Sequence, residues 1–484
     1  MFGGAKGGGA TELDAFYPIR PECKADVPQT RFKPRAGKTL SERRWHASFT
    51  QDGHLDIAKV LRRIQRGLVK SYQELVLVEL IFLLKISGVL IEAAPLLAYG
   101  VHPSIKGVVW EFLLGCYDPN STFEERNLLK EQRSTSIRLL PLPDASAYDH
   151  SSLLLAITAI TAALEKYNTW KAECQRVVNV IGTGKFITTP LIGEDGQPTD
   201  NSLIGVPLSD KKVLQWVQTL HQIGLDVVRT DRALVFYESE TNQAKLWDVL
   251  SVYTWLDDDI GYVQGMNDIC SPMVILLENE ADSFWCFERA MRRMRENFRT
   301  SASSMGVQSQ LSTLSQIMKT VDPKLHQHLD DLDGGEYLFA FRMLMVLFRR
   351  EFSFADTLYL WELMWGMEYN PNIFSLYEKS DSESEPAEAN ENAHTLSAKS
   401  LKQYGKFERK NLTIGNTEQQ HSALAVFLVA SVLEIKNRRI LKEAKGVDDV
   451  VKILGDITST LDAKKACTEA LKIQKKYLTK TKKA

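Results

Sequence analysis

The sequence predicts an all-α fold, and three observations lead to that prediction. Apolar residues recur at helical spacing through the centre of the chain, for example at Val213, Trp216, Val217 and Leu220. No stretch sustains the alternation of apolar and polar residues that is typical of a half-buried strand, so we expect no substantial sheet. The 484 residues are 44% hydrophobic, which is enough for one large helical domain or two smaller ones.

The composition argues against several classes of protein. The chain has 59 basic and 61 acidic residues and a net charge of −2, so we expect no nucleic-acid partner. Its six cysteines are scattered and form no C-x-x-C motif, which favours a reducing compartment over a zinc site or a disulfide framework. The N-terminus lacks the basic-then-apolar pattern of a secretion signal, and neither end shows a lipidation motif.

The N-terminal part of the chain is expected to contain little fixed structure. Residues 1–40 are rich in glycine, proline and charge, which predicts a disordered segment. Its basic residues could contact an anionic membrane surface, but we interpret them as part of a solvated linker. Residues 41–67 form a lead-in helix region, with order starting near Trp45 and a helix over 57–64.

An unusually apolar segment follows at 68–99. The run from Leu75 to Ala98 approaches the ~20 residues that a membrane-spanning helix needs. Glu79, Lys85 and Glu92 interrupt it, and each charge costs about 2.5–3.5 kcal/mol at the centre of a membrane helix. We therefore predict that this segment does not span a membrane.

The first of two polar clusters combines an acid with an arginine. Ile223, Asp226 and Arg229 are spaced by three, so on a helix they share one face and the carboxylate can reach the guanidinium. An arginine aimed in this way presents a planar set of donors that suits phosphate oxygens. Taken alone, such a pair is more often an ordinary surface ion pair.

The second cluster combines a tyrosine, a glutamine and a glycine. Tyr262, Gln264 and Gly265 follow the acidic run 257–259, which suits a helix start. Gly265 disfavours a helix, so we expect it to permit a close backbone approach. Gln264 can both donate and accept, as orienting a water molecule requires. The alternative for this cluster alone is a buried, satisfied glutamine beside a packing glycine.

Together the two clusters resemble a known family. The pattern I-x-x-D-x-x-R at 223–229, followed by Y-x-Q-G-M at 262–266, resembles the two catalytic motifs of TBC-domain Rab GTPase-activating proteins. Residues 102–115 look like the opening helix of that domain. Residues 341–352 and 360–362 look like its later core helices.

The resemblance also suggests a domain map. It implies that 68–99 is an insert. After it we expect a multi-helix TBC-type Rab-GAP domain at 100–370, interrupted by a second insert at about 134–163. The further segments are a disordered acidic loop at 371–420 and C-terminal helices with a lysine-rich tail at 421–484. Because the two inserts interrupt an otherwise continuous match, we hypothesise that they arise from variant splicing or from an error in the gene prediction. Lys106 stands where the family usually shows arginine.

The resemblance implies roles for individual residues. Arg229 would be an arginine finger and Gln264 a glutamine finger, both supplied in trans to a Rab GTPase. Asp226 would hold Arg229, and Tyr262 would orient the glutamine loop. The remaining supporting positions would be Ile223, Gly265, Met266 and Asp268.

The implied function is acceleration of GTP hydrolysis by a GTP-bound Rab-family GTPase in vesicle trafficking. The chain would be an activator rather than an enzyme, and it would need no cofactor because GTP and magnesium belong to the Rab. It would be cytoplasmic, with at most peripheral association with endomembranes. Residues 182–185 resemble a phosphate loop but lack its full spacing, so we interpret them as a turn.

Two other functions remain open at this point. One is a Rab-binding helical scaffold without GTPase-activating activity, although the presence of both fingers counts against it. The other is a helical scaffold with no GTPase partner, for which the pair of motifs would be a coincidence.

Overall fold

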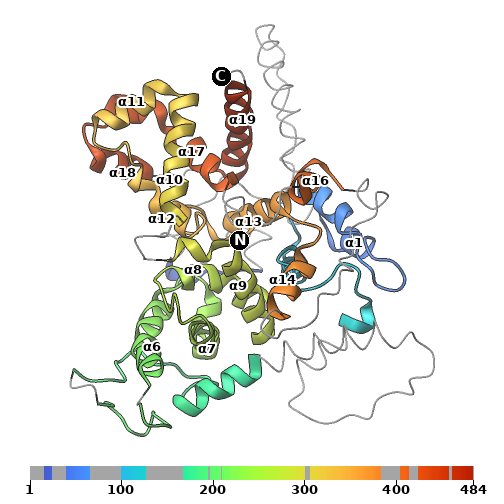
Figure 1. The fold of residues 1–484 in the computed structure, drawn as a ribbon, viewed down its shortest axis with the longest axis vertical. Coiled ribbons are helices and arrows are strands. Elements are labelled where there is room, and N and C mark those ends of the chain that lie inside the picture. The colour runs from blue at the N-terminus through green and yellow to red at the C-terminus, as the bar shows by residue number, and fades with distance from the viewer. Residues whose placement is uncertain are drawn as a thin grey trace, which may run out of the picture.

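The protein is all-α in the residues that its structure, a computed structural model, describes (Figure 1). Within these residues the only β-type pairings are isolated bridges, so the prediction of an all-helical fold is confirmed. The described residues are 16–23, 40–65, 100–126, 167–194, 197–208, 210–299, 306–382, 404–413, 423–456 and 461–482.

One group of helices lies around the two polar clusters. Consecutive helices of this group pack against each other, and tryptophans tie the first two together. The Trp216 indole donates to the Ser251 carbonyl at 2.9 Å, and the Trp247 indole donates to the Leu220 carbonyl at 3.0 Å. The helices of this group are α6 (Lys211–Arg229), α7 (Glu240–Leu256), α8 (Met266–Leu276) and α9 (Glu280–Met294).

A second group forms the opposite end of the molecule (Figure 1). Its longest helix packs on both α10 and α19 and brings the C-terminal part of the chain onto the middle part. The group comprises α10 (Gly306–Val321), α11 (Pro323–Asp331), α12 (Phe341–Met345), α17 (Ala423–Glu443), α18 (Val447–Gly455) and α19 (Ala463–Thr481).

Helix α13 (Phe354–Glu368) lies between the two groups and is almost entirely buried. It packs against α3 (Lys106–Leu113), where the Trp110 ring lies 6.0 Å from that of Trp361 and 4.8 Å from that of Trp365. The other short helices are α1 (Glu42–His46), η2 (Pro21–Cys23), η4 (Pro103–Ile105), η5 (Val235–Glu238), η6 (Arg295–Asn297) and η7 (Leu338–Ala340).

The chain departs from the helix expected over 341–352. Helix α12 ends at Met345, and Leu347 and Phe348 adopt positive φ angles of 46° and 59°. The next helix, α13, begins afresh because the Ser353 side chain accepts from the Asp356 amide at 3.2 Å. Residues 346–352 are therefore a turn, which we call the 346–352 turn.

Two segments expected to be disordered contain described structure that contacts the core. Within 371–420 lie α14 (Ile373–Ser382) and α16 (Lys406–Thr413). Ile373 is buried in the core, and the Asn411 amide donates to the Met367 carbonyl at 2.9 Å. Within 1–40, Ile19 forms an isolated bridge with Leu234. These apolar and polar contacts to distant residues explain order that composition did not reveal.

Other expectations on segments meet the structure only in part. The inserts at 68–99 and 134–163 lie outside the described residues, so they stay predictions. None of the helices that the structure describes has the length and apolar character needed to cross a membrane. Residues 182–185 begin in a turn, and the Gly182 amide donates to the Asp248 carboxylate at 3.1 Å rather than facing solvent.

A buried ion pair joins α3 to α13. The Lys106 ammonium lies 2.5 Å from a Glu362 carboxylate oxygen, and the two side chains are only 6% and 1% exposed. Glu362 also accepts from the Trp110 indole at 3.3 Å and from the Val101 amide at 3.2 Å. Lysine at this position therefore neutralises a carboxylate in the centre of the fold.

We predict that Lys106→Met lowers the free energy of unfolding by about 3–5 kcal/mol, because it leaves the Glu362 charge buried without its partner. Urea unfolding measures this loss. Replacing both residues with methionine should cost less than the sum of the two single changes. Additive losses would mean that the two charges do not depend on each other.

Candidate functional site

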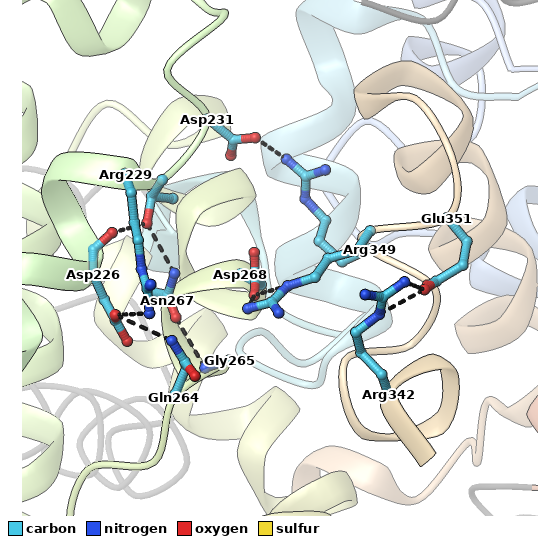
Figure 2. A network of polar contacts seen from close by, with 12 residues as sticks. Asp226, Arg229, Asp231, Gln264, Gly265, Asn267, Asp268, Arg342, Arg349 and Glu351 are labelled. Atoms are coloured by element: carbon cyan, nitrogen blue, oxygen red, sulfur yellow. Dashed lines mark hydrogen bonds and ion pairs between the residues drawn. The ribbon is translucent and has the colours of Figure 1, made fainter. Parts of the chain in front are cut away.

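The first polar cluster lies in the last turn of α6. Asp226 is buried, whereas Arg229, the last residue of the helix, has a side chain that is 57% exposed. The Arg229 Nη2 atom donates to Asp226 Oδ1 at 2.5 Å (Figure 2). A buried carboxylate therefore orients an exposed guanidinium, in the geometry that i, i+3 spacing on a helix allows.

The acidic run 257–259 differs from its expected role. It does not begin a helix: α7 ends at Leu256, and residues 257–265 form a loop, which we call the glutamine loop. The Asp257 carboxylate binds the Arg295 guanidinium through two hydrogen bonds of 2.7 and 2.8 Å, and Asp259 binds it at 2.9 Å. Because these carboxylates bind an arginine on η6, they hold the start of the loop against η6.

The far end of this loop returns to Asp226. The Tyr262 hydroxyl donates to Asp226 Oδ2 at 2.6 Å, and Gln264 Nε2 lies 3.5 Å from Asp226 Oδ1. Burial raises the pKa of Tyr262, and the hydrogen bond to Asp226 raises this pKa further, so the phenol stays protonated and remains a donor. Gln264 itself is exposed, like Arg229.

Gly265 ends the loop in a conformation that other residues rarely adopt. Its φ is 110°, and it is the N-cap residue of α8. A Cβ atom here would lie 2.8 Å from Val346 Cγ1, in the 346–352 turn. The close approach expected at this glycine is therefore to a side chain, and the left-handed backbone conformation is a second reason for glycine.

Asn267 is a central residue that the sequence analysis did not single out. Its Oδ1 accepts from the Gly265 amide at 3.0 Å, and its Nδ2 donates to Thr230 Oγ1 at 2.9 Å. The Thr230 hydroxyl in turn donates to the Asp226 carbonyl at 2.7 Å. Asn267 thus links the glutamine loop to the end of α6. A polar residue in the first turn of an apolar helix was the signal available in the sequence.

The other predicted site residues lie behind this arrangement. Ile223 and Met266 are fully buried and pack in the hydrophobic core. Asp268 does not contact Asp226; its carboxylate accepts from the Arg350 guanidinium at 2.7 and 2.9 Å. Burial raises the pKa of Asp268, and the nearby Arg350 opposes that increase.

The site offers donors rather than ligands for a metal. Asp226 already accepts hydrogen bonds from arginine and tyrosine, and within the described ranges no group of three or more His, Cys, Asp or Glu side chains could hold a metal ion. Arg229 and Gln264 reach solvent beside each other because they share one carboxylate oxygen. An exposed guanidinium beside an exposed amide can bind an anion and orient a water molecule.

The part of the chain that carries this site matches a known protein family. Residues 202–377, which include both clusters, match the model of the Rab-GTPase-TBC domain. Rab GTPase-activating protein 22 of Arabidopsis thaliana is 29% identical over 335 residues, which cover 55% of this chain and 60% of that protein. TBC1 domain family member 17 of Homo sapiens is 42% identical over 153 residues, 31% of this chain and 23% of that protein. The chain thus matches less than two thirds of the length of these relatives.

A solved structure, that of the Ypt/Rab-GAP domain of Gyp1p, is also similar. It is 16% identical, with a TM-score of 0.45, and the match covers 80% of this chain and 90% of that chain.

We predict that Gly265→Ala lowers the free energy of unfolding by more than Gly261→Ala does. Both glycines have positive φ, so each alanine costs about 1–2 kcal/mol for its backbone. Only the alanine at 265 meets Val346, which adds about 1–3 kcal/mol of overpacking. A Cβ at 261 would meet nothing within 4 Å, so that variant is the control. Urea unfolding measures the free energy of unfolding of both variants. Equal losses would show that the Val346 side chain moves aside without cost.

Proposed function

This chain belongs to the family of proteins that contain a Rab-GTPase-TBC domain, and from that premise we propose that it accelerates GTP hydrolysis by a Rab-family GTPase. It acts as an activator, supplying residues in trans to a nucleotide site that belongs to its partner. The printed name of its Arabidopsis relative, Rab GTPase-activating protein 22, supports this proposal.

One observation carries the proposal. Two exposed side chains from separate elements, Arg229 from α6 and Gln264 from the loop after α7, are held by the same buried carboxylate (Figure 2). A structural ion pair would not need the glutamine, and a packing glutamine would not be exposed. A pair of fixed donors that reach solvent side by side is what phosphoryl transfer requires of an activator, because catalysis there is mainly positioning and charge stabilisation.

Arg229 stabilises the charge that develops on the transferred phosphoryl group. Its guanidinium carries a full positive charge and donates one hydrogen bond to Asp226, which leaves its other N–H groups available. Asp226 limits the rotation of the side chain, so less entropy is lost when the guanidinium meets the phosphate.

Gln264 orients the attacking water. Its amide oxygen can accept from the water while its amide nitrogen stays near Asp226, so the position of the oxygen is set before the partner binds. Tyr262 supports this arrangement from the buried side, since its hydroxyl donates to the other oxygen of Asp226. In the complex, the water attacks the γ-phosphate of GTP, and the products are GDP and phosphate.

The partner is the GTP-bound form of a Rab-family GTPase. GTP and its magnesium ion belong to that partner, so this chain needs no cofactor of its own. The proposed place of action is the cytoplasmic surface of endomembranes, through peripheral association, in vesicle trafficking.

We predict that the intact chain accelerates single-turnover GTP hydrolysis by at least one member of a panel of purified Rab GTPases, and that Arg229→Ala removes about 10³–10⁵-fold of that acceleration. Arg232→Ala is the control, because Arg232 is an exposed arginine only three residues further along. Equal rates for the two variants would contradict a finger role for Arg229.

We predict that Gln264→Ala lowers the accelerated rate by about 10²–10³-fold, which is the size of loss that removing one preorganised hydrogen-bonding group causes in other active sites. Gln308→Ala, at an exposed glutamine of α10, should leave the rate unchanged. Binding of GTP-loaded Rab, measured by interferometry, should persist in both variants. Binding without any acceleration by the intact chain would instead identify a Rab-binding scaffold, and the absence of both would refute a Rab partner.

A further inference from the structure

Two consecutive arginines of the 346–352 turn each pair with an aspartate just beyond one of the two fingers. We call residues 226–231 and 262–268, which include the fingers and these aspartates, the two finger elements. Arg349 forms an ion pair with Asp231, which lies two residues beyond Arg229. Arg350 forms an ion pair with Asp268, which lies four residues beyond Gln264, through Nε and Nη2 at 2.9 and 2.7 Å. Figure 2 shows Asp231 and Asp268 on the same side of Arg349, the side on which Asp226 and Arg229 also lie.

The backbone of the turn explains how neighbouring residues reach different elements. Leu347 and Phe348 have positive φ, a conformation that costs about 1–3 kcal/mol for each residue and persists only where surrounding contacts enforce it. Here the Phe348 amide donates to the Met343 carbonyl at 2.8 Å, and the Trp361 indole donates to the Leu347 carbonyl at 2.9 Å. These contacts fix the backbone from which the two arginine side chains extend.

Each of the two finger elements has a second contact that belongs to the same assembly. On the arginine side, Asp231 also accepts from Ser271 Oγ at 2.6 Å, which ties the end of α6 to α8. On the glutamine side, Val346 of the turn packs so closely against Gly265 that a Cβ atom there would clash. The turn thus contacts the glutamine loop directly as well as through Arg350.

We propose that Arg349 and Arg350 are positioning residues that fix the separation and orientation of Arg229 and Gln264. The effect on rate rests on the proposed function; the effect on the free protein does not. Neither arginine needs to touch the partner: each acts through an aspartate on a finger element. The alternative is that the exposed Arg350 binds the partner itself.

Arg350 is the better position to test. Arg349 is 8% exposed, so its removal would disturb folding as well as geometry. Arg350 is 38% exposed and its partner Asp268 is 16% exposed, so losing this pair should cost less stability than losing the pair of Arg349 with Asp231. Misplacement of a reacting group by about 1 Å can nevertheless cost 10²-fold in rate. A large loss of rate with little loss of stability is therefore the signature of positioning.

The matched control is Arg342. It lies in α12, just before the turn, is 58% exposed, and pairs at 3.0 Å with Glu351, a buried residue of the turn, rather than with a finger element. Arg342→Gln removes the same charge from the same neighbourhood and leaves both finger contacts in place.

We predict that Arg350→Gln lowers kcat about 10- to 100-fold on the Rab that the intact chain accelerates, with KM changed less than about threefold. Arg342→Gln should leave kcat within about twofold. Asp268→Asn should reproduce the loss, and the double variant should lose no more than either single one, because both changes break the same contact. A loss confined to KM, or equal kcat losses at 350 and 342, would overturn the proposal.

A measurement on the free protein separates this proposal from the proposed function. The Gly265 amide, which donates to Asn267, should exchange its hydrogen at least about fivefold faster in Arg350→Gln than in the unaltered chain, and unchanged in Arg342→Gln. Unchanged exchange in Arg350→Gln would refute positioning even if the chain is active. Faster exchange in a chain that accelerates no Rab would retain the positioning role and refute the proposed function.

Discussion

The buried carboxylate of Asp226 is the constraint on which the candidate site depends. A carboxylate removed from water is costly unless donors surround it. Its donors come from two elements, Arg229 at the end of α6 and Tyr262, which lies 36 residues after Asp226. Satisfying this one charge therefore brings the end of a helix against a loop, and Gln264 reaches the same carboxylate from that loop. The site follows from a requirement of folding before any partner is involved.

Two kinds of contact maintain this junction, and they differ in how they depend on solvent. The links through Asn267 and Thr230 are buried hydrogen bonds between neutral groups, which salt does not screen. The pair of Arg350 with Asp268 lies partly in water, where ions weaken it. The buried links hold the end of α6 against α8. The outer pair can then adjust the geometry of the site without deciding whether the chain folds.

The sequence predicted what depends on local spacing and missed what depends on distant contacts. The i, i+3 spacing of Asp226 and Arg229 was sufficient to predict their hydrogen bond. The acidic run at 257–259 suggested a helix start, because nothing nearby shows that Arg295 binds it. The 346–352 turn was hidden within an apolar run, although Ser353, three residues before Asp356, is a helix-start signal. Asn267 was overlooked because Thr230, to which its side chain donates, lies at the end of α6 and far away in the sequence.

Because Arg229 is exposed, its effect on the stability of the free chain gives little information about its role. In water an exposed ion pair stabilises a fold by about 0–1 kcal/mol, so the free chain gains little from this guanidinium. Against a phosphate, with water excluded, the effective dielectric constant falls and the same charge interacts several times more strongly. In the proposed mechanism its contribution therefore arises in the complex. Arg342 is equally exposed and also pairs with a buried carboxylate, that of Glu351, so what distinguishes Arg229 is that its carboxylate, Asp226, also holds Gln264.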